Sequence, residues 1–147
     1  TSIQGTKVGK KTFLGPFARV RGFSEIGENC QIGNFVEIKN SIIGNYARIN
    51  HMAFIGDSFL QDNVTIGAGV ITCNHDGEST NETIIEEGAY VGSNSNLIAP
   101  LTIGKESTIG SGSTISLDVL EKTLVLARPR QQTIESWQGS RKKRKRK

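Results

Sequence analysis

The 147-residue sequence lacks the features that identify several common classes of protein. It contains only two cysteines, too few for the disulfide framework of a small secreted domain, so we expect a reducing, cytoplasmic location. No run of 18 apolar residues is present, which excludes a membrane-spanning helix, and no signal peptide precedes the patterned part of the chain. Aromatic residues make up only 6% of the sequence, so the core must be built mainly from aliphatic side chains.

The net charge of +4 comes from one end of the chain. The segment "RKKRKRK", residues 141–147, holds seven of the 18 basic residues, and the other 11 are outnumbered by 14 acidic residues. The rest of the chain is therefore mildly acidic and lacks the excess of basic residues typical of nucleic-acid-binding domains, so no specific nucleic-acid partner is expected. We interpret 141–147 as a solvated, disordered tail, with contact to phosphates or anionic surfaces as the alternative.

An aliphatic residue recurs every six positions in two long runs, with two five-residue steps in the first. The positions are Val8, Leu14, Val20, Ile26, Ile32, Ile38, Ile43, Ile49, Ile55, Leu60 and Ile66, then Ile85, Val91, Leu97, Ile103, Ile109 and Ile115. Glycine often follows the aliphatic residue, and the residue four positions after it is usually small. A helix would repeat every three or four residues and an ordinary strand every two. A fixed period of six instead indicates a repeat fold.

The six-residue period predicts a parallel β-helix. Each hexad would form a short strand and a corner, with the aliphatic and small residues pointing inward and glycine helping the chain to turn. Three hexads would complete a triangular coil of 18 residues, and the coils would stack at about 4.8 Å. A β-sandwich is the alternative, but its strands would not hold this register over two long runs. We assign 1–119 to the β-helix and 120–140 to a C-terminal extension with a short strand or helix.

The period fails between Thr72 and Thr83, where "CNHDGESTNE" is polar and rich in turn-forming residues. We expect a loop over 73–83 that leaves the β-helix at a corner. Loops on rigid scaffolds often carry function. His75 and Asp76 have no further ligands at metal spacing, so no metal site is predicted.

Two basic residues, Arg21 and Lys39, are 18 positions apart and each follows an inward aliphatic residue. They should therefore stack, and two like charges about 5 Å apart repel by roughly 1–3 kcal/mol at intermediate dielectric. Either this is a solvated basic face or an anion such as a phosphate lies between them. His51 falls near a corner within about one coil of the pair. Because imidazole titrates near neutrality, His51 is a candidate general base, with a structural histidine as the alternative.

Five segments in order, "GPFARVRG", "IGNFVEIKN", "INHMAFIGD", "NVTIGAGVITCNHDG" and "VGSNSNLIAPLTIG", carry a family resemblance. They resemble the C-terminal acetyltransferase domain of the bacterial bifunctional N-acetylglucosamine-1-phosphate uridyltransferase / glucosamine-1-phosphate acetyltransferase. The likeness extends through "ARPRQQTIESW" to the basic end. The family's N-terminal nucleotidyltransferase domain and first coils have no counterpart, and the chain has no initiator Met, so we expect a fragment of a longer protein.

The hexads also resemble those of hexapeptide acyltransferases, which implies a left-handed β-helix. The general rule for parallel crossovers would favour the opposite hand. The family resemblance further implies acetyl transfer from acetyl-CoA to the 2-amino group of glucosamine-1-phosphate, on the route to UDP-N-acetylglucosamine for cell-envelope polymers. It implies a homotrimer with sites between subunits and with the C-terminal extension packed on the trimer. No metal is implied in this domain.

Position by position, the resemblance assigns the catalytic base to His51, the phosphate contacts to Arg21 and Lys39, and further acceptor contacts to three altered positions. Phe54, Thr65 and Thr80 stand where the family usually has Tyr, Asn and Lys. A lost charged contact to phosphate costs roughly 1.5–3 kcal/mol, enough to raise the acceptor's KM by about an order of magnitude. Another amino-sugar acceptor therefore stays open, as does a non-catalytic trimeric scaffold.

The resemblance also assigns five contacts to acetyl-CoA. They are Asn74, His75, Ser93, Ser111 and Arg128. His75 stands where the family usually has Tyr, and Ser111 where it usually has Ala. The donor positions are thus mostly kept, while three of the five matched acceptor positions have changed. Backbone N–H groups at the turns could stabilise the tetrahedral oxyanion.

Overall fold

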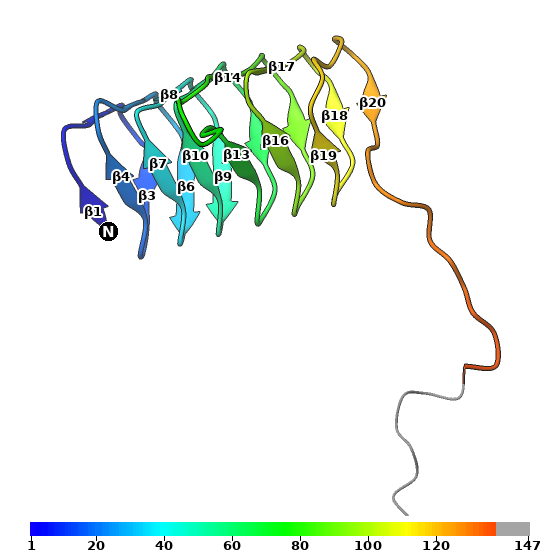
Figure 1. The fold of residues 1–147 in the computed structure, drawn as a ribbon. Helices are drawn as coiled ribbons and strands as arrows, with labels where there is room; N and C mark the ends of the chain where they lie inside the picture. The colour runs from blue at the N-terminus through cyan, green and yellow to red at the C-terminus, as the bar shows by residue number, and fades with distance from the viewer. Residues whose placement is uncertain (138–147) are drawn as a thin grey trace, which may run out of the picture.

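A computed structural model of the protein describes residues 1–137, which fold into a prism of stacked coils made from short β-strands (Figure 1). No α-helix occurs among these residues, and hence none that is long and apolar enough to cross a membrane. The strands form three parallel sheets, which we name A, B and C.

Each sheet contains one strand from each coil, except that the last coil adds only an isolated bridge, Ile103 to Val119, to sheet B, and the strands pair in coil order. Sheet A contains β1 (Ser2–Ile3), β4 (Arg19–Arg21), β7 (Glu37–Lys39), β10 (Phe54–Gly56), β13 (Ile71–Cys73), β16 (Asn96–Ile98) and β19 (Thr114–Ile115). Sheet B contains β2 (Lys7–Val8), β5 (Glu25–Ile26), β8 (Ile42–Ile43), β11 (Ser58–Leu60), β14 (Thr83–Ile85) and β17 (Leu101–Ile103). Sheet C contains β3 (Phe13–Leu14), β6 (Gln31–Asn34), β9 (Arg48–His51), β12 (Thr65–Ile66), β15 (Tyr90–Val91), β18 (Thr108–Ile109) and β20 (Leu124–Val125).

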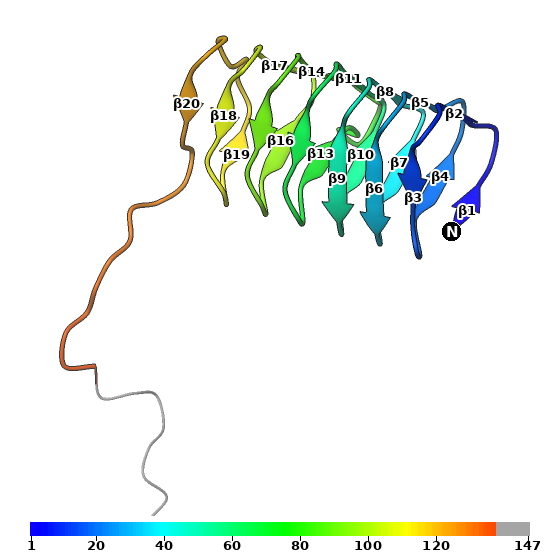
Figure 2. The same ribbon diagram turned by 180° about the vertical axis from the view of Figure 1, so that it is seen from behind.

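The chain runs through sheets A, B and C in turn, so the prism has three corners, which we call A–B, B–C and C–A. Each strand pairs with the strand one coil earlier; Val20, for example, pairs with Ile38, and Ile38 pairs with Ile55. Figures 1 and 2 show the coils from opposite sides, stacked along one axis from β1 to β20. The predicted parallel β-helix of hexapeptide repeats is confirmed, and the architecture is consistent with the left-handed form.

The core is the row of aliphatic side chains that the six-residue period identified. Ile32, Ile49 and Leu97 are completely buried, and the small residues between the strands are buried with them. Cys30, one of these small residues, is buried in the core. Val8 is 41% exposed because it lies in the first coil, where no preceding coil covers it.

The hexad glycines serve a different purpose from the one predicted. Of the ten glycines that directly follow an aliphatic position, only Gly15 has a positive φ, so most do not turn the corner. A Cβ atom added to Gly9 would lie 2.5 Å from the carbonyl carbon of Gly27, which is closer than any real contact. Glycine is therefore needed because the next coil passes close by. The positive φ falls two residues later, at corner residues such as Lys11 and Asn29.

The interruption of the period is a loop over 74–82 at the A–B corner, between the end of β13 and the start of β14. An isolated antiparallel bridge between His75 and Thr80 closes it. The C-terminal extension contains the strand β20 and, up to residue 137, no helix. After β20 the chain leaves the stack of coils (Figures 1 and 2). The end of the predicted extension and the predicted tail, 141–147, lie outside the described residues.

The corner conformation makes a testable prediction about stability. Lys11 is exposed and has φ 57°, a region that costs an L-residue about 1 kcal/mol or more. Lys11→Gly should therefore raise the free energy of unfolding by about 1 kcal/mol. Lys10→Gly, at a neighbouring residue without positive φ, should lower it by a similar amount. Chemical denaturation of both variants tests this, and equal destabilisation by the two changes would contradict it.

Candidate functional site

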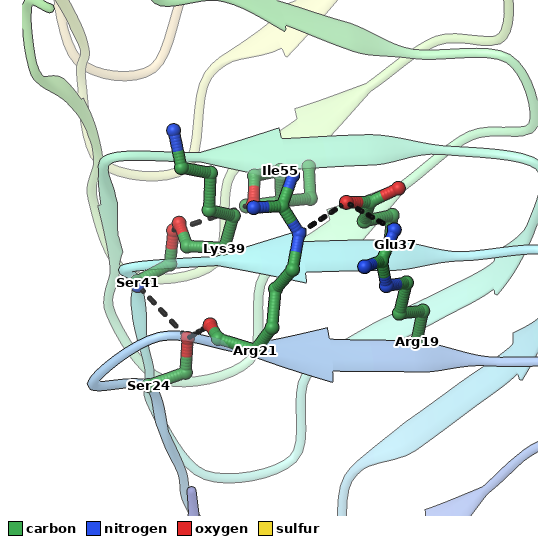
Figure 3. A network of polar contacts seen from close by, with 7 residues as sticks. All are labelled: Arg19, Arg21, Ser24, Glu37, Lys39, Ser41 and Ile55. Atoms are coloured by element: carbon green, nitrogen blue, oxygen red, sulfur yellow. Dashed lines mark hydrogen bonds and ion pairs between the residues drawn. The ribbon is translucent and has the colours of Figure 1, made fainter. Parts of the chain in front are cut away.

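The predicted stacking of Arg21 on Lys39 is present at the end of sheet A. The two residues pair in register, and Gly56 continues the row in the next coil. The charge of Arg21 is paired, because Arg21 Nε donates a 2.7 Å hydrogen bond to Glu37 Oε1 (Figure 3). Arg19 lies 3.8 Å from the same carboxylate oxygen. Lys39 Nζ makes no ion pair with any of residues 1–137. At this edge Arg21 is therefore paired with a carboxylate and Lys39 is not.

Glu37 is a site residue that the sequence reasoning missed. It lies on β7, two residues before Lys39 and on the same outward side. The signal was present, since Arg19 precedes Glu37 by the same 18 residues that separate Arg21 from Lys39, and the two pairs are in register. The Glu37 carboxylate offsets part of the repulsion between the two cations, which neither of the two alternatives from the sequence, a solvated basic face or a bound anion, included.

His51 ends β9 and stands at the C–A corner, in register with Asn34 of β6. It is exposed and lines a cavity of about 390 Å³ together with Phe13, Pro16 and Asn34. His51 shares a coil with Lys39, as predicted, but sheet A separates their corners. Its imidazole is open to a substrate from the outside of the prism.

Asn74 lies at the opposite end of β10 from His51, within the A–B corner. Its side-chain amide donates to Asp57 Oδ2 at 2.5 Å, and Asn40 Nδ2 donates to Asp57 Oδ1 at 3.3 Å. Asn74 is 9% exposed, so this contact is largely shielded from water. Asn74 therefore lies beside Asp57 of the preceding coil. Within one chain, however, Asn74 and His51 are a strand apart rather than adjacent.

The loop over 74–82 is organised around the carboxylate of Asp76. Hydrogen bonds from the backbone N–H groups of Ser79 and Glu78, and then from the Asn81 side chain, hold the pKa of Asp76 well below its ordinary value. His75 Nδ1 accepts a hydrogen bond from the Gly77 N–H at 3.0 Å. Thr80 sits across the loop from His75. The Asp76 carboxylate is therefore the hydrogen-bond acceptor that holds the turn of this loop together.

Three of the residues predicted to contact acetyl-CoA lie together along the C–A corner. The Gly112 N–H donates to the Ser93 carbonyl at 2.8 Å, which places Ser93 and Ser111 in adjacent coils. Arg128 Nη1 donates to the Ser111 carbonyl at 2.7 Å. Arg128 also lines a cavity of about 650 Å³ with Leu126 and residues 129–131. Since His51 occupies the same corner in an earlier coil, one edge carries the candidate base and these donor residues.

The predicted acceptor contacts are divided between faces of the prism. Phe54 lies on sheet A, in register between Glu37 and Ile71, and is partly buried. Thr65 lies on sheet C, in register between the strands of Arg48 and Tyr90. Side chains that point outward from different sheets of one prism diverge. A single chain therefore does not gather all of these residues around one ligand.

Neither cysteine is suited to nucleophilic catalysis. Burial raises the pKa of the Cys30 thiol, and burial likewise raises the pKa of Cys73. Both groups are therefore protonated at neutral pH, and the thiolate is the reactive form. Among residues 1–137, no group of three or more His, Cys, Asp or Glu side chains is placed to hold a metal ion. The chemistry of this surface rests on an imidazole, two cations and hydrogen-bonding groups.

Comparisons with known proteins agree with this fold. The model of the bacterial transferase hexapeptide (six repeats) matches residues 5–40 and 82–116. The chain is similar to the bifunctional protein GlmU of Ralstonia pickettii, with 46% identity over 143 residues that make up 97% of this chain. It spans 31% of that relative, and thus about a third of the length of the curated relatives it matches.

Two solved structures share the architecture. GDP-perosamine N-acetyl transferase from Caulobacter crescentus, in complex with CoA and GDP-perosamine, gives a TM-score of 0.71 at 24% identity over 79% of this chain and 53% of that one. The acetyltransferase domain of PglB from Neisseria gonorrhoeae, in complex with acetyl coenzyme A, gives a TM-score of 0.72 at 22% identity over 80% of this chain and 55% of that one. At these identities the likeness shows the fold alone.

The turn around Asp76 leads to a prediction about the loop. Because the pKa of Asp76 is lower in the folded loop than in an unfolded chain, the ionised carboxylate stabilises the loop above the pKa of an unfolded aspartate, about 3.9. This stabilisation is lost as the pH falls through the lower pKa of the folded loop. Asp76→Asn should make the Glu78 and Ser79 amides exchange with deuterium several-fold faster at pH 7, because the neutral amide is a weaker acceptor. The control is Glu82→Gln, at an exposed carboxylate of the same loop. Unchanged exchange in Asp76→Asn would contradict the prediction.

Proposed function

Because this chain is a hexapeptide-repeat protein that is 46% identical over 97% of its length to a bifunctional GlmU protein, we propose that it is an acetyl-CoA-dependent N-acetyltransferase. The proposed acceptor is glucosamine-1-phosphate, acetylated on its 2-amino group, and the product would enter UDP-N-acetylglucosamine synthesis. The observation that carries the proposal is the edge that combines an open imidazole, His51, with Ser93 and Ser111. Acetyl-CoA is a cytoplasmic metabolite, so the proposal also places the protein in the cytoplasm.

In the proposed mechanism, His51 acts as a general base. It removes a proton from the acceptor's amino group as the nitrogen attacks the thioester carbonyl carbon of acetyl-CoA. The tetrahedral intermediate carries its negative charge on the former carbonyl oxygen, where backbone N–H groups at the corners can donate. Collapse breaks the C–S bond, and CoA leaves as the thiol after taking a proton. No acyl-enzyme forms, in keeping with the raised pKa values of both cysteine thiols.

We assign the acceptor's phosphate to Arg21 and Lys39. Glu37 holds the Arg21 guanidinium through Nε, which leaves the terminal nitrogens for a ligand. Lys39 Nζ is free of ion pairs within residues 1–137 and supplies a second charge beside it. Charge-assisted contacts of this kind are the strongest available for a phosphate. Asn74 and His75 would contribute from the loop to the donor side.

The proposal includes a homotrimer with sites between subunits. The division of Phe54 and Thr65 between sheets A and C supports it, since a second prism can bring the faces of two different sheets together. The C-terminal extension supports it as well. Leu126, Ile134 and Trp137 are 53%, 72% and 71% exposed in the single chain, and packing on a neighbouring prism would cover this apolar surface.

A different amino-sugar acceptor is the second candidate. Phe54 has no hydroxyl to offer a ligand, and Thr80, in the loop, has neither the length nor the charge of a lysine. Three of the five assigned acceptor contacts depart from the family pattern, against two of the five assigned to acetyl-CoA, and Ser93, Ser111 and Arg128 are brought together at the C–A corner. Acetyl-CoA is therefore the donor under both candidates, and the two differ only in the acceptor.

Replacement of His51 tests the mechanism. His51→Ala should lower kcat by about 10² to 10⁴-fold, because the step loses its general base, and should leave the KM for acetyl-CoA nearly unchanged. CoA release, followed as free thiol with glucosamine-1-phosphate as the acceptor, measures both constants. Glu25→Gln, on sheet B, is the control and should turn over like the unaltered protein. An unchanged kcat in His51→Ala would rule out this mechanism.

Replacement of Thr80 distinguishes the two acceptors. If glucosamine-1-phosphate is the acceptor, Thr80→Lys should lower its KM by about tenfold through a new charged contact to the phosphate. The KM for unphosphorylated glucosamine should stay the same. Thr80→Gln supplies a similar length without charge and should not help. No gain from lysine, together with faster turnover of another amino sugar in a panel, would favour the second candidate.

A further inference from the structure

Behind the Arg21 and Lys39 edge runs a row of buried hydroxyl groups. Ser24, Ser41 and Ser58 occupy equivalent positions at the A–B corner of three successive coils, directly before β5 and β8 and at the first residue of β11, and each is at most 4% exposed. Burial of a hydroxyl is unfavourable unless the group finds hydrogen-bond partners. Three in a row at one corner therefore require a structural explanation.

In the three coils that contain these serines, only the A–B corner has a hydroxyl-bearing residue at this buried position. The equivalent position at the C–A corner holds Ala or Val in four successive coils, and at the B–C corner it holds Cys, Ala or Val. These residues are Ala18, Val36, Ala53 and Val70, and then Cys30, Ala47 and Val64. All are buried, so the position itself demands only a small side chain. Serine at the A–B corner adds hydrogen bonding rather than volume.

Each serine hydroxyl donates to the main chain at the end of a sheet A strand. Ser24 Oγ donates to the Arg21 carbonyl at 2.9 Å, and Ser41 Oγ donates to the Lys39 carbonyl at 2.8 Å (Figure 3). Ser58 Oγ donates to the Gly56 carbonyl at 2.7 Å. The first two carbonyls belong to the two residues assigned to the phosphate, and the third belongs to the next residue of the same row.

The serines are also linked to one another. The Ser41 N–H donates to Ser24 Oγ at 3.2 Å, and the Ser58 N–H donates to Ser41 Oγ at 3.1 Å. The middle serine, Ser41, thus fixes the Lys39 carbonyl and the backbone of the next coil with a single oxygen. Lys39 O accepts a second bond from the Asp57 N–H at 2.9 Å. The two bonds between successive serines are buried, where a hydrogen bond is stronger than in water.

We propose that Ser24 and Ser41 are positioning residues, whose hydroxyls fix the main chain of Arg21 and Lys39 and so set the spacing of the two cations that hold the acceptor's phosphate. Ser58 supports them from the next coil, because its N–H donates to Ser41 Oγ. This inference rests on the proposed function for the identity of the acceptor. It requires, on its own, only that the edge binds a phosphate group.

The test compares side chains of equal shape with and without the hydroxyl. Ser41→Val removes the hydrogen bonds, and Val36 and Val64 show that valine fits this position at the other corners. Ser41→Thr keeps the hydroxyl. Thr6, at the same position of the A–B corner in the first coil, donates to the Gln4 carbonyl two residues earlier, as Ser41 donates to the Lys39 carbonyl, so threonine supports this geometry.

Two measurements are made on each variant: binding of inorganic phosphate, followed by ³¹P NMR, and steady-state kinetics with glucosamine-1-phosphate. Ser41→Val should raise the phosphate dissociation constant and the acceptor KM about five- to tenfold, with the KM for acetyl-CoA unchanged. Ser41→Thr should stay within about twofold of the unaltered protein. Ser24→Val provides a second loss of hydroxyl should Ser41→Val fold poorly, with the same expected shift.

Ser107→Val is the matched control, because Ser107 is buried at the B–C corner and donates to the Gly104 carbonyl at 2.6 Å. It should lose thermal stability without any change in phosphate binding. Equal phosphate affinities in Ser41→Val and Ser41→Thr, or an equal loss in Ser107→Val, would overturn the proposal. Failure of the proposed function would appear differently, as the absence of acetyl transfer in the unaltered protein, while phosphate binding would still test the serines.

Discussion

The structure depends on one constraint, the register between successive coils. Parallel pairing fixes each strand residue beside the residue one coil earlier, as Val20 beside Ile38 and Ile38 beside Ile55. Because the coils are about 4.8 Å apart, every side chain has a vertical neighbour that the sequence period determines. Aliphatic residues then build a continuous core, and a glycine such as Gly9 is required where the next backbone comes too close. The same constraint stacks charge on charge and hydroxyl on hydroxyl.

This register explains how much of the fold could be predicted from the sequence. The period alone was enough for the sheets, the core and the pairing of Arg21 with Lys39, because these depend on spacing. It was not enough for the role of the glycines, since a period does not distinguish a positive φ from a close approach. It placed His51 within about one coil of Lys39 but did not show that the two side chains lie at different corners. The direction of a side chain at a corner depends on local backbone angles, such as the φ of 47° at Met52, which no pattern of apolar residues encodes.

The polar contacts were harder to predict than the apolar ones. Glu37 could have been found from its spacing to Arg19, but its bond to Arg21 joins two residues 16 apart, which the 18-residue step does not anticipate. The two cations of this edge consequently differ in character. Arg21 is oriented by a carboxylate, whereas Lys39 carries its charge on a flexible side chain. A fixed guanidinium with a mobile ammonium beside it suits recognition of an anion in more than one orientation.

The separation of the corners has a consequence for how such a protein changes over time. The residues assigned to the acceptor's phosphate lie at the A–B corner, while Ser93, Ser111 and Arg128 lie along the C–A corner, with the width of sheet A between them. Mutations more than about 7–10 Å apart usually have additive effects. Natural selection can therefore alter one corner without loss of function at the other. On such a prism, a lineage can change acceptor contacts at the A–B corner while Ser93, Ser111 and Arg128 keep their contacts with the acyl donor.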